Sequence, residues 1–296
     1  MLICLLPQID APISLALGIL FSIFLANPLP QFSSSWSKKL LQISVVGLGF
    51  GVGLGNVLRE GEKSIYYTVV GIFFTLALGA AIGKMLKVNS NTSRLISFGT
   101  AICGGSAIAA MAPVIKAKNE EVAVSLATVF TLNSVALFLF PVVGHILNMD
   151  QQSFGIWAGM AIHDTSSVVG AASSYGNDAL MTGVTVKLTR ALWITPFVIG
   201  FSFIGKSKGK ITIPYFIFGF IAAAVIATLF PAQNYFWNAI SFAAKRLLVV
   251  TLFLIGSGLS RETIKNVGAR PLAQGVAIWI IVSAVTLSVI LLKIIR

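Results

Sequence analysis

Apolar runs of about 20 residues alternate with short polar segments along the whole chain. Eight of these runs are uninterrupted, and a helix of that length crosses a bilayer core of about 30 Å. We expect spans at residues 11–27, 40–58, 64–86, 121–147, 179–204, 212–230, 238–259 and 271–292. The polar segments between them are too short for a separate soluble domain, so residues 1–296 are expected to form a single transmembrane domain.

Two further apolar segments contain residues that disfavour a continuous helix. Residues 95–116 carry Gly104 and Gly105 at their centre, where each glycine costs about 1 kcal/mol relative to alanine. Residues 153–174 carry a related pattern, in which residues 159–166 match the first segment at four of eight positions. With these two interrupted helices, the chain is expected to be an all-α polytopic membrane protein of about ten membrane segments.

The distribution of basic residues bears on how the interrupted segments enter the membrane. If both cross as broken helices, the basic residues of the connecting loops divide eleven against six between the two sides. If both are re-entrant hairpins, the division becomes thirteen against four, and the hairpins enter from opposite faces. The second arrangement obeys the positive-inside rule better, although broken helices that cross completely are also common in transporters. Both arrangements place the two termini outside the cytoplasm.

The first and last helices also share a pattern. Residues 39–41 align with residues 246–248 as a basic residue followed by two leucines. Further matches pair Gly18, Ala26 and Pro30 with Gly219, Ala227 and Pro231. Such an inverted repeat is typical of secondary transporters, and it predicts a substrate-bearing core at residues 95–204 within scaffold repeats at 1–94 and 205–296. The alternative is chance similarity, because leucine and glycine are abundant in any membrane chain.

Composition agrees with a membrane location. The chain is 56% hydrophobic and 10% charged, and its mean hydropathy is +0.92. Its formal charge of +12 does not indicate nucleic-acid binding, because the 21 Lys and Arg residues lie in pairs between apolar segments and form no basic face. Cys4 and Cys103 lie in apolar surroundings with neither metal-site nor disulfide spacing.

Motifs for enzyme chemistry are absent from the sequence. It contains no zinc-protease His-Glu-x-x-His, no Gly-x-Ser-x-Gly elbow and no Walker-type phosphate loop. Cys103 and His163 could form a nucleophile pair, but no third group orients them. We therefore expect no enzyme activity, no cofactor, no metal and no nucleotide-driven transport by this chain.

The two breaks are the expected substrate site. At a helix break inside a membrane, free backbone N–H groups and the positive ends of helix dipoles can bind an anion. The candidate binding residues there are Cys103, Gly104, Gly105, Ser106, Thr165, Ser166 and Ser167. The alternative is that the glycines only allow close helix packing, as small residues often do in membranes.

Two basic residues stand inside an otherwise apolar helix. Lys187 and Arg190 are three residues apart, so they share one helix face. A charge inside a membrane costs at least about 2.5 kcal/mol and usually faces a partner or a polar cavity. We expect this pair to bind an anionic substrate, unless Asp164 simply neutralises one of the two charges.

Three polar residues complete the candidate site. Asn133 lies in the middle of a span, where it either lines the site or bridges helices by hydrogen bonds. His163 and Asp164 stand at the second break, where a histidine beside an acid could relay protons and couple transport to a proton gradient. The alternative for His163 is a structural role.

Several motifs resemble a known family. The chain carries GTAICGGSAIAA at residues 99–110, APVIKAK at 112–118, WAG at 157–159, IHD at 162–164 and VKLTR at 186–190. These motifs resemble the sulfate exporter family of YeiH-type bacterial inner-membrane proteins. The family commonly has Glu where Asp164 stands and Gln where Ser167 stands. The first difference keeps an acid, and the second changes a hydrogen-bonding side chain at the expected site.

The resemblance implies a secondary transporter of the inner membrane that exports sulfate or a related small anion. An anion channel would use the same positive residues, and a sodium-coupled organic-acid carrier would use Asp164, Asn133 and backbone carbonyls at the breaks as an ion site. The expected partners are a small anion, the lipid bilayer and a coupling proton or sodium ion, without nucleic acid. The sequence leaves open whether the protein forms a homodimer.

Overall fold

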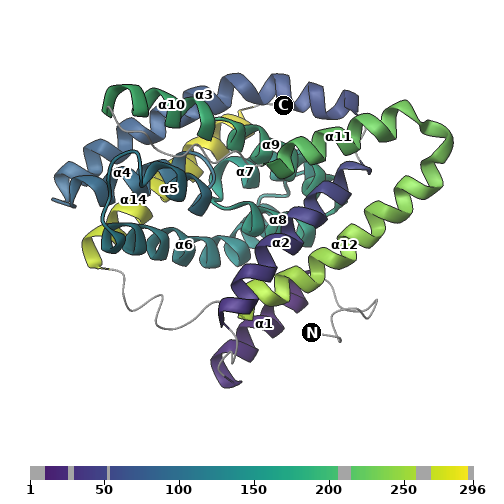
Figure 1. Ribbon diagram of the computed structural model, residues 1–296, viewed down its shortest axis with the longest axis horizontal. Helices are drawn as coiled ribbons and strands as arrows, with labels where there is room; N and C mark the ends of the chain where they lie inside the picture. The colour runs from purple at the N-terminus through teal and green to yellow at the C-terminus, as the bar shows by residue number, and fades with distance from the viewer. Residues whose placement is uncertain (1–10, 26–29, 52–53, 206–214, 258–267, 293–296) are drawn as a thin grey trace. The chain divides into compact units, whose positions relative to one another are not determined.

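The protein is helical throughout the residues that the structure describes, which are 11–25, 30–51, 54–205, 215–257 and 268–292 of this computed structural model (Figure 1). No strand occurs within these ranges. Five of the described helical segments are long and apolar enough to cross a membrane, at residues 66–85, 119–146, 177–201, 231–257 and 269–291. The prediction of an all-α membrane protein is therefore confirmed.

Contacts divide the chain into two compact units. The first unit comprises residues 1–61 and 214–261, and the second comprises residues 62–213 and 262–296. The expected division into scaffold and core concerns which parts move during transport, so it stays a prediction.

The first unit is a small group of helices. Its helices are α1 (Ala11–Leu25), α2 (Pro30–Gly49), α11 (Tyr215–Leu229), the short η2 (Pro231–Gln233) and α12 (Asn234–Ser257). Ser14 of α1 donates a hydrogen bond of 2.6 Å to the Val249 carbonyl of α12. Glycine allows these helices to approach closely, because a Cβ added at Gly18 would lie 2.2 Å from the Phe253 carbonyl oxygen.

One contact in this unit bears on the predicted terminal repeat. A Cβ added at Gly219 of α11 would lie 2.8 Å from the Val46 side chain of α2. The alignment of Gly18 with Gly219, and of residue 39 with residue 246, makes this contact the counterpart of the one between Gly18 and Phe253. The repeat itself stays a prediction, and the paired contacts favour it.

The second unit holds both interrupted segments. Its helices are α3 (Leu54–Met85, in this unit from Glu62 on), α4 (Ser90–Ala101), α5 (Gly105–Met111), α6 (Asn119–Ile146), α7 (Gln151–Ala161), α8 (Thr165–Tyr175), α9 (Asn177–Leu192), α10 (Ile194–Gly205) and α14 (Ala269–Leu291). The breaks predicted within residues 95–116 and 153–174 are thus present.

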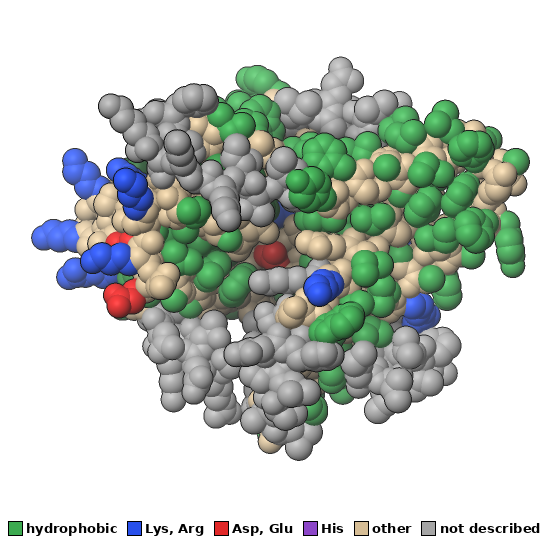
Figure 2. All heavy atoms as spheres, in the orientation of Figure 1, with side chains coloured by type: hydrophobic (Ala, Val, Ile, Leu, Met, Phe, Trp, Pro, Cys, Tyr) green, Lys and Arg blue, Asp and Glu red, His purple; other side chains and the backbone are tan. Residues whose placement is uncertain are grey.

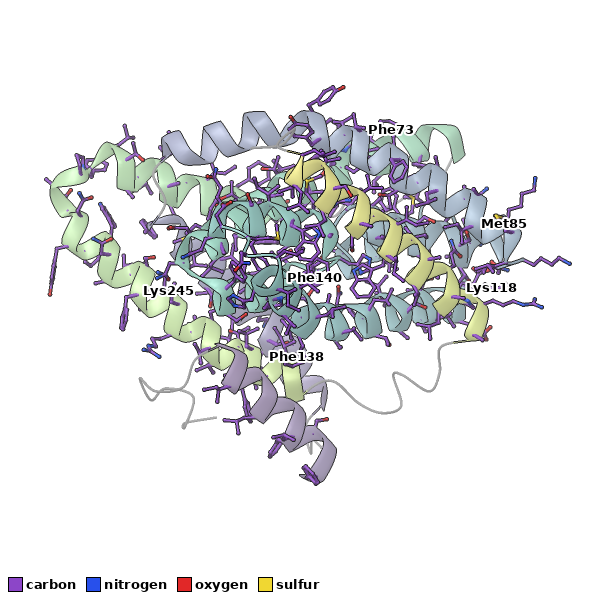
Figure 3. All side chains as sticks on the ribbon, turned by 180° about the vertical axis from the view of Figure 1, so that it is seen from behind. Phe73, Met85, Lys118, Phe138, Phe140 and Lys245 are labelled. Atoms are coloured by element: carbon purple, nitrogen blue, oxygen red, sulfur yellow. The ribbon has the colours of Figure 1, made fainter. Side chains whose placement is uncertain are left out.

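The first interrupted segment doubles back on itself. Asn91, at the start of α4, donates a hydrogen bond of 3.0 Å to Glu121, at the start of α6. A Cβ added at Gly99 of α4 would lie 2.9 Å from the Ile108 side chain of α5, so the two arms lie against each other. Figure 3 likewise shows Met85, at the end of α3, and Lys118 at the same end of this unit. The segment therefore has the shape of a helical hairpin, and its re-entrant placement in the membrane stays a prediction.

The second interrupted segment has the same shape at the other end of α6. The Tyr175 hydroxyl, at the end of α8, donates a hydrogen bond of 2.6 Å to the Met149 carbonyl, just before α7. The ring of Tyr175 also stacks on Phe154 of α7, with centroids 3.8 Å apart. The start of α7 and the end of α8 thus lie together, and the two hairpins approach from opposite ends of α6.

Helix α14 packs across the unit through polar and aromatic contacts. Gln274 is fully buried and donates hydrogen bonds to the Gly79 carbonyl (3.1 Å) and the Ser93 hydroxyl (2.8 Å). Phe140 of α6, labelled in Figure 3, stacks on Trp279 of α14 with centroids 6.0 Å apart. These contacts connect α14, α3, α4, α6 and α7 into one packed framework around the breaks.

One expected span is wrong in its bounds. The span at 40–58 is divided, because α2 ends at Gly49 in a turn through Phe50 and Gly51, and α3 begins at Leu54. The apolar run continues across this helix end, so hydropathy gives no sign of the break. The span expected at 179–204 agrees with the membrane-length segment 177–201, which α9 and α10 form on either side of Trp193.

Candidate functional site

The tips of the two hairpins meet. Gly104 lies in the first break with φ at +68° and ψ at −124°, a conformation that residues with a side chain rarely adopt. A Cβ added there would lie 3.4 Å from both the Asp164 Cβ and the His163 carbonyl oxygen. The two breaks therefore lie so close together that a single methyl group at Gly104 would touch the second one.

Asn133 of α6 lies beside the hairpin tips and contacts the second one. Its side-chain carbonyl accepts a hydrogen bond of 3.2 Å from the backbone N–H of His163, and its side chain is only 3% exposed. The Asn133 amide nitrogen and both ring nitrogens of His163 are buried without a hydrogen-bond partner. Because buried polar groups are nearly always paired, these atoms point to a ligand or water that belongs beside the breaks.

The two basic side chains of α9, Lys187 and Arg190, also lie beside the two breaks. Lys187 and Arg190 are 0% and 2% exposed. The Lys187 ammonium donates a hydrogen bond of 2.6 Å to the Ile162 carbonyl in the second break. The Arg190 guanidinium donates one of 2.6 Å to the Ala101 carbonyl at the end of α4, and another to the Met160 carbonyl near the end of α7. One helix thus holds both hairpins.

The ends of α5 and α8 are only partly open to a ligand. The Asp164 carboxylate accepts hydrogen bonds from the backbone N–H (3.1 Å) and the hydroxyl of Ser166, so it caps α8 itself. The Gly104 N–H donates to the Gly99 carbonyl at 2.8 Å. Two of the groups expected to bind the anion thus already have partners within the protein.

The other candidate residues surround the same breaks. Cys103 is a buried free thiol, and Thr165 is buried, whereas Ser167 is partly exposed and Ser106 is exposed. The missing side chain of Gly105 lets Phe130 of α6 approach, since a Cβ there would lie 3.1 Å from that ring. Close packing therefore explains Gly105, and the substrate role of these residues stays a prediction.

Sequence reasoning did not single out Thr100, whose hydroxyl is buried without a partner just before the first break. It also missed the particular carbonyl groups that Lys187 and Arg190 contact. A threonine inside an apolar segment gives only a weak signal, and every residue carries a carbonyl.

Comparisons with known proteins agree with a membrane protein. The family model described as conserved hypothetical protein 698 matches residues 4–275. A UPF0324 membrane protein of Geobacter sulfurreducens is 58% identical over 285 residues, which are 96% of this chain and 92% of that protein. A UPF0324 membrane protein of Bdellovibrio bacteriovorus is 50% identical, over 98% of this chain and 92% of its own length. No solved structure is significantly similar.

These names describe a membrane protein and give no substrate. They agree with a multi-pass membrane location. The resemblance to sulfate exporters accordingly stays a prediction.

Proposed function

The chain belongs to the family described as conserved hypothetical protein 698, and we propose that it is a secondary transporter that carries a small anion across the bacterial inner membrane. The observation that supports this most is the contact between the two hairpin tips beside Asn133 and His163, whose buried polar atoms have no partner in the protein. Paired re-entrant or broken helices that meet in this way are typical of secondary transporters.

The electrostatic surroundings favour a negatively charged substrate. Lys187 and Arg190 place two basic side chains around the breaks, and Asp164 is the carboxylate that the described residues place there. A small oxyanion that accepts hydrogen bonds from the Asn133 amide and the His163 ring fits these surroundings. Sulfate is the member of this class that the family resemblance suggests.

The orientation in the membrane follows from surface charge. Figure 2 shows basic side chains gathered at one end of the second unit, with acidic ones among them. The exposed basic residues from the last turn of α3 to the start of α6 are Lys84, Lys87, Arg94, Lys116 and Lys118. By the positive-inside rule this end of the second unit faces the cytoplasm. The placement of both termini outside the cytoplasm stays a prediction from the sequence.

Transport by purified protein in liposomes tests the proposal. We expect saturable uptake of radiolabelled sulfate that responds to an imposed pH gradient. Asn133→Ala removes the unpartnered amide and one hydrogen bond to His163, so its uptake should fall about tenfold, as expected for the loss of about 1.4 kcal/mol of binding.

Asn119→Ala is the matched control, because Asn119 is an exposed residue at the start of the same helix. Equal uptake by the two variants would contradict the assignment of Asn133 to the site. Uptake that does not saturate and ignores every gradient would indicate an anion channel instead. If competition shows that another small anion is carried and sulfate is not, sulfate is discarded and the anion site is retained.

A further inference from the structure

The carbonyl groups at the hairpin tips already have cationic partners. The Ala101 and Met160 carbonyls stand at the carboxyl ends of α4 and α7, where helix dipoles concentrate partial negative charge. The Ile162 carbonyl follows directly in the second break. All three accept hydrogen bonds from Lys187 or Arg190.

Such carbonyl groups are the usual ligands of a coupling sodium ion in transporters with interrupted helices. Here the ammonium of Lys187 and the guanidinium of Arg190 lie 2.6 Å from two of them, in positions closed to solvent. A metal ion bound to these oxygen atoms would lie directly beside a side chain that carries a like charge, and the repulsion disfavours its binding.

We propose that Lys187 and Arg190 are resident cations that take the place of a coupling metal ion, so that anion transport by this protein does not require sodium. The inference rests on the proposed function, because sodium can be unnecessary for transport only if the protein is a transporter. It assigns the two side chains a positioning role, in which one helix, α9, neutralises the ends of both hairpins and fixes their tips together. Direct contact with the anion is left to the unpartnered groups of Asn133 and His163.

Other charged and titratable groups near the breaks agree with this assignment. Asp164 interacts electrostatically with Lys187 and caps α8. Cys103, in the first break, is a buried free thiol. Among the described residues, no group of three or more His, Cys, Asp or Glu side chains could hold a metal ion.

The experiment compares the purified protein in sodium chloride and in choline chloride at equal ionic strength. We expect the same apparent unfolding temperature in both salts, and the same initial rate of anion uptake into liposomes. A rise in unfolding temperature or in uptake that is specific to sodium would overturn the proposal. The unfolding comparison is decisive even if no anion is transported, and that failure would count against the transport function alone.

A second comparison uses Lys187→Gln, because it removes the positive charge beside the Ile162 carbonyl. We expect sodium, and not choline, to raise the unfolding temperature of this variant. Lys187→Arg, which keeps a cation, and Lys118→Gln, which changes an exposed lysine, should show no such rise. A folded Lys187→Gln protein that responds equally to both salts would contradict the replacement. If this variant does not fold, the wild-type comparison decides.

Discussion

Arg190→Ala is expected to abolish transport and to lower stability by about 2 to 4 kcal/mol. The change removes a side chain that donates hydrogen bonds to the ends of both α4 and α7, and it leaves the Ala101 and Met160 carbonyls without these donors. Hydrogen bonds from charged donors contribute about 1.5 to 3 kcal/mol each, and the relief of burying a charge offsets part of the loss. Apparent unfolding temperature in detergent and uptake in liposomes measure the two effects.

Arg94→Ala is the control for this prediction. Arg94 belongs to α4 as well, but its side chain is exposed. Its loss should change stability by less than about 0.5 kcal/mol, as is usual for surface substitutions. If the Arg190 and Arg94 variants had the same unfolding temperature and uptake, Arg190 would not hold the hairpins.

Gly104→Ala is expected to impair transport more than stability. Alanine at φ of +68° costs about 1 to 3 kcal/mol, because that backbone conformation is strained for a residue with a side chain. The added methyl group would also lie between the hairpin tips, against Asp164 and the His163 carbonyl. We expect folded protein with a lowered unfolding temperature and uptake reduced by at least tenfold.

Gly200→Ala serves as the comparison, since no atom lies within 4 Å of a Cβ added at this position in α10. Alanine there should be neutral or slightly stabilising, because it favours the helix by up to about 1 kcal/mol. Wild-type uptake by the Gly104 variant would show that the close approach of the two tips is unimportant.

The breaks could be predicted from the sequence because their cause is local. Paired glycines at 104 and 105, and a polar His163-Asp164 pair within an apolar segment, each disfavour a continuous helix. That each segment folds back as a hairpin could be predicted only indirectly, from the number of basic loop residues on each side of the membrane. Its physical basis lies in contacts between distant residues, such as that of Asn91 with Glu121.

The partners of the buried cations could not be predicted. The sequence indicated that Lys187 and Arg190 are enclosed and need compensation, and it suggested the substrate or Asp164 as the partner. In the structure both cations contact backbone carbonyls, a group present in every residue and therefore invisible in a sequence pattern. The wrong span at 40–58 has a related cause, because averaged hydropathy does not register the turn after Gly49.

Reactivity of Cys103 tests most directly the claim that the meeting point of the hairpins is the transport site. Cys103 lies in the first break and is 2% exposed. Replacing Cys4, the one other cysteine, with serine leaves it as the sole thiol for a membrane-impermeant reagent applied from either side of liposomes. We predict slow modification from both sides, slowed severalfold by a transported anion. Reactivity from neither side, or a rate that no transported anion changes, would contradict the account.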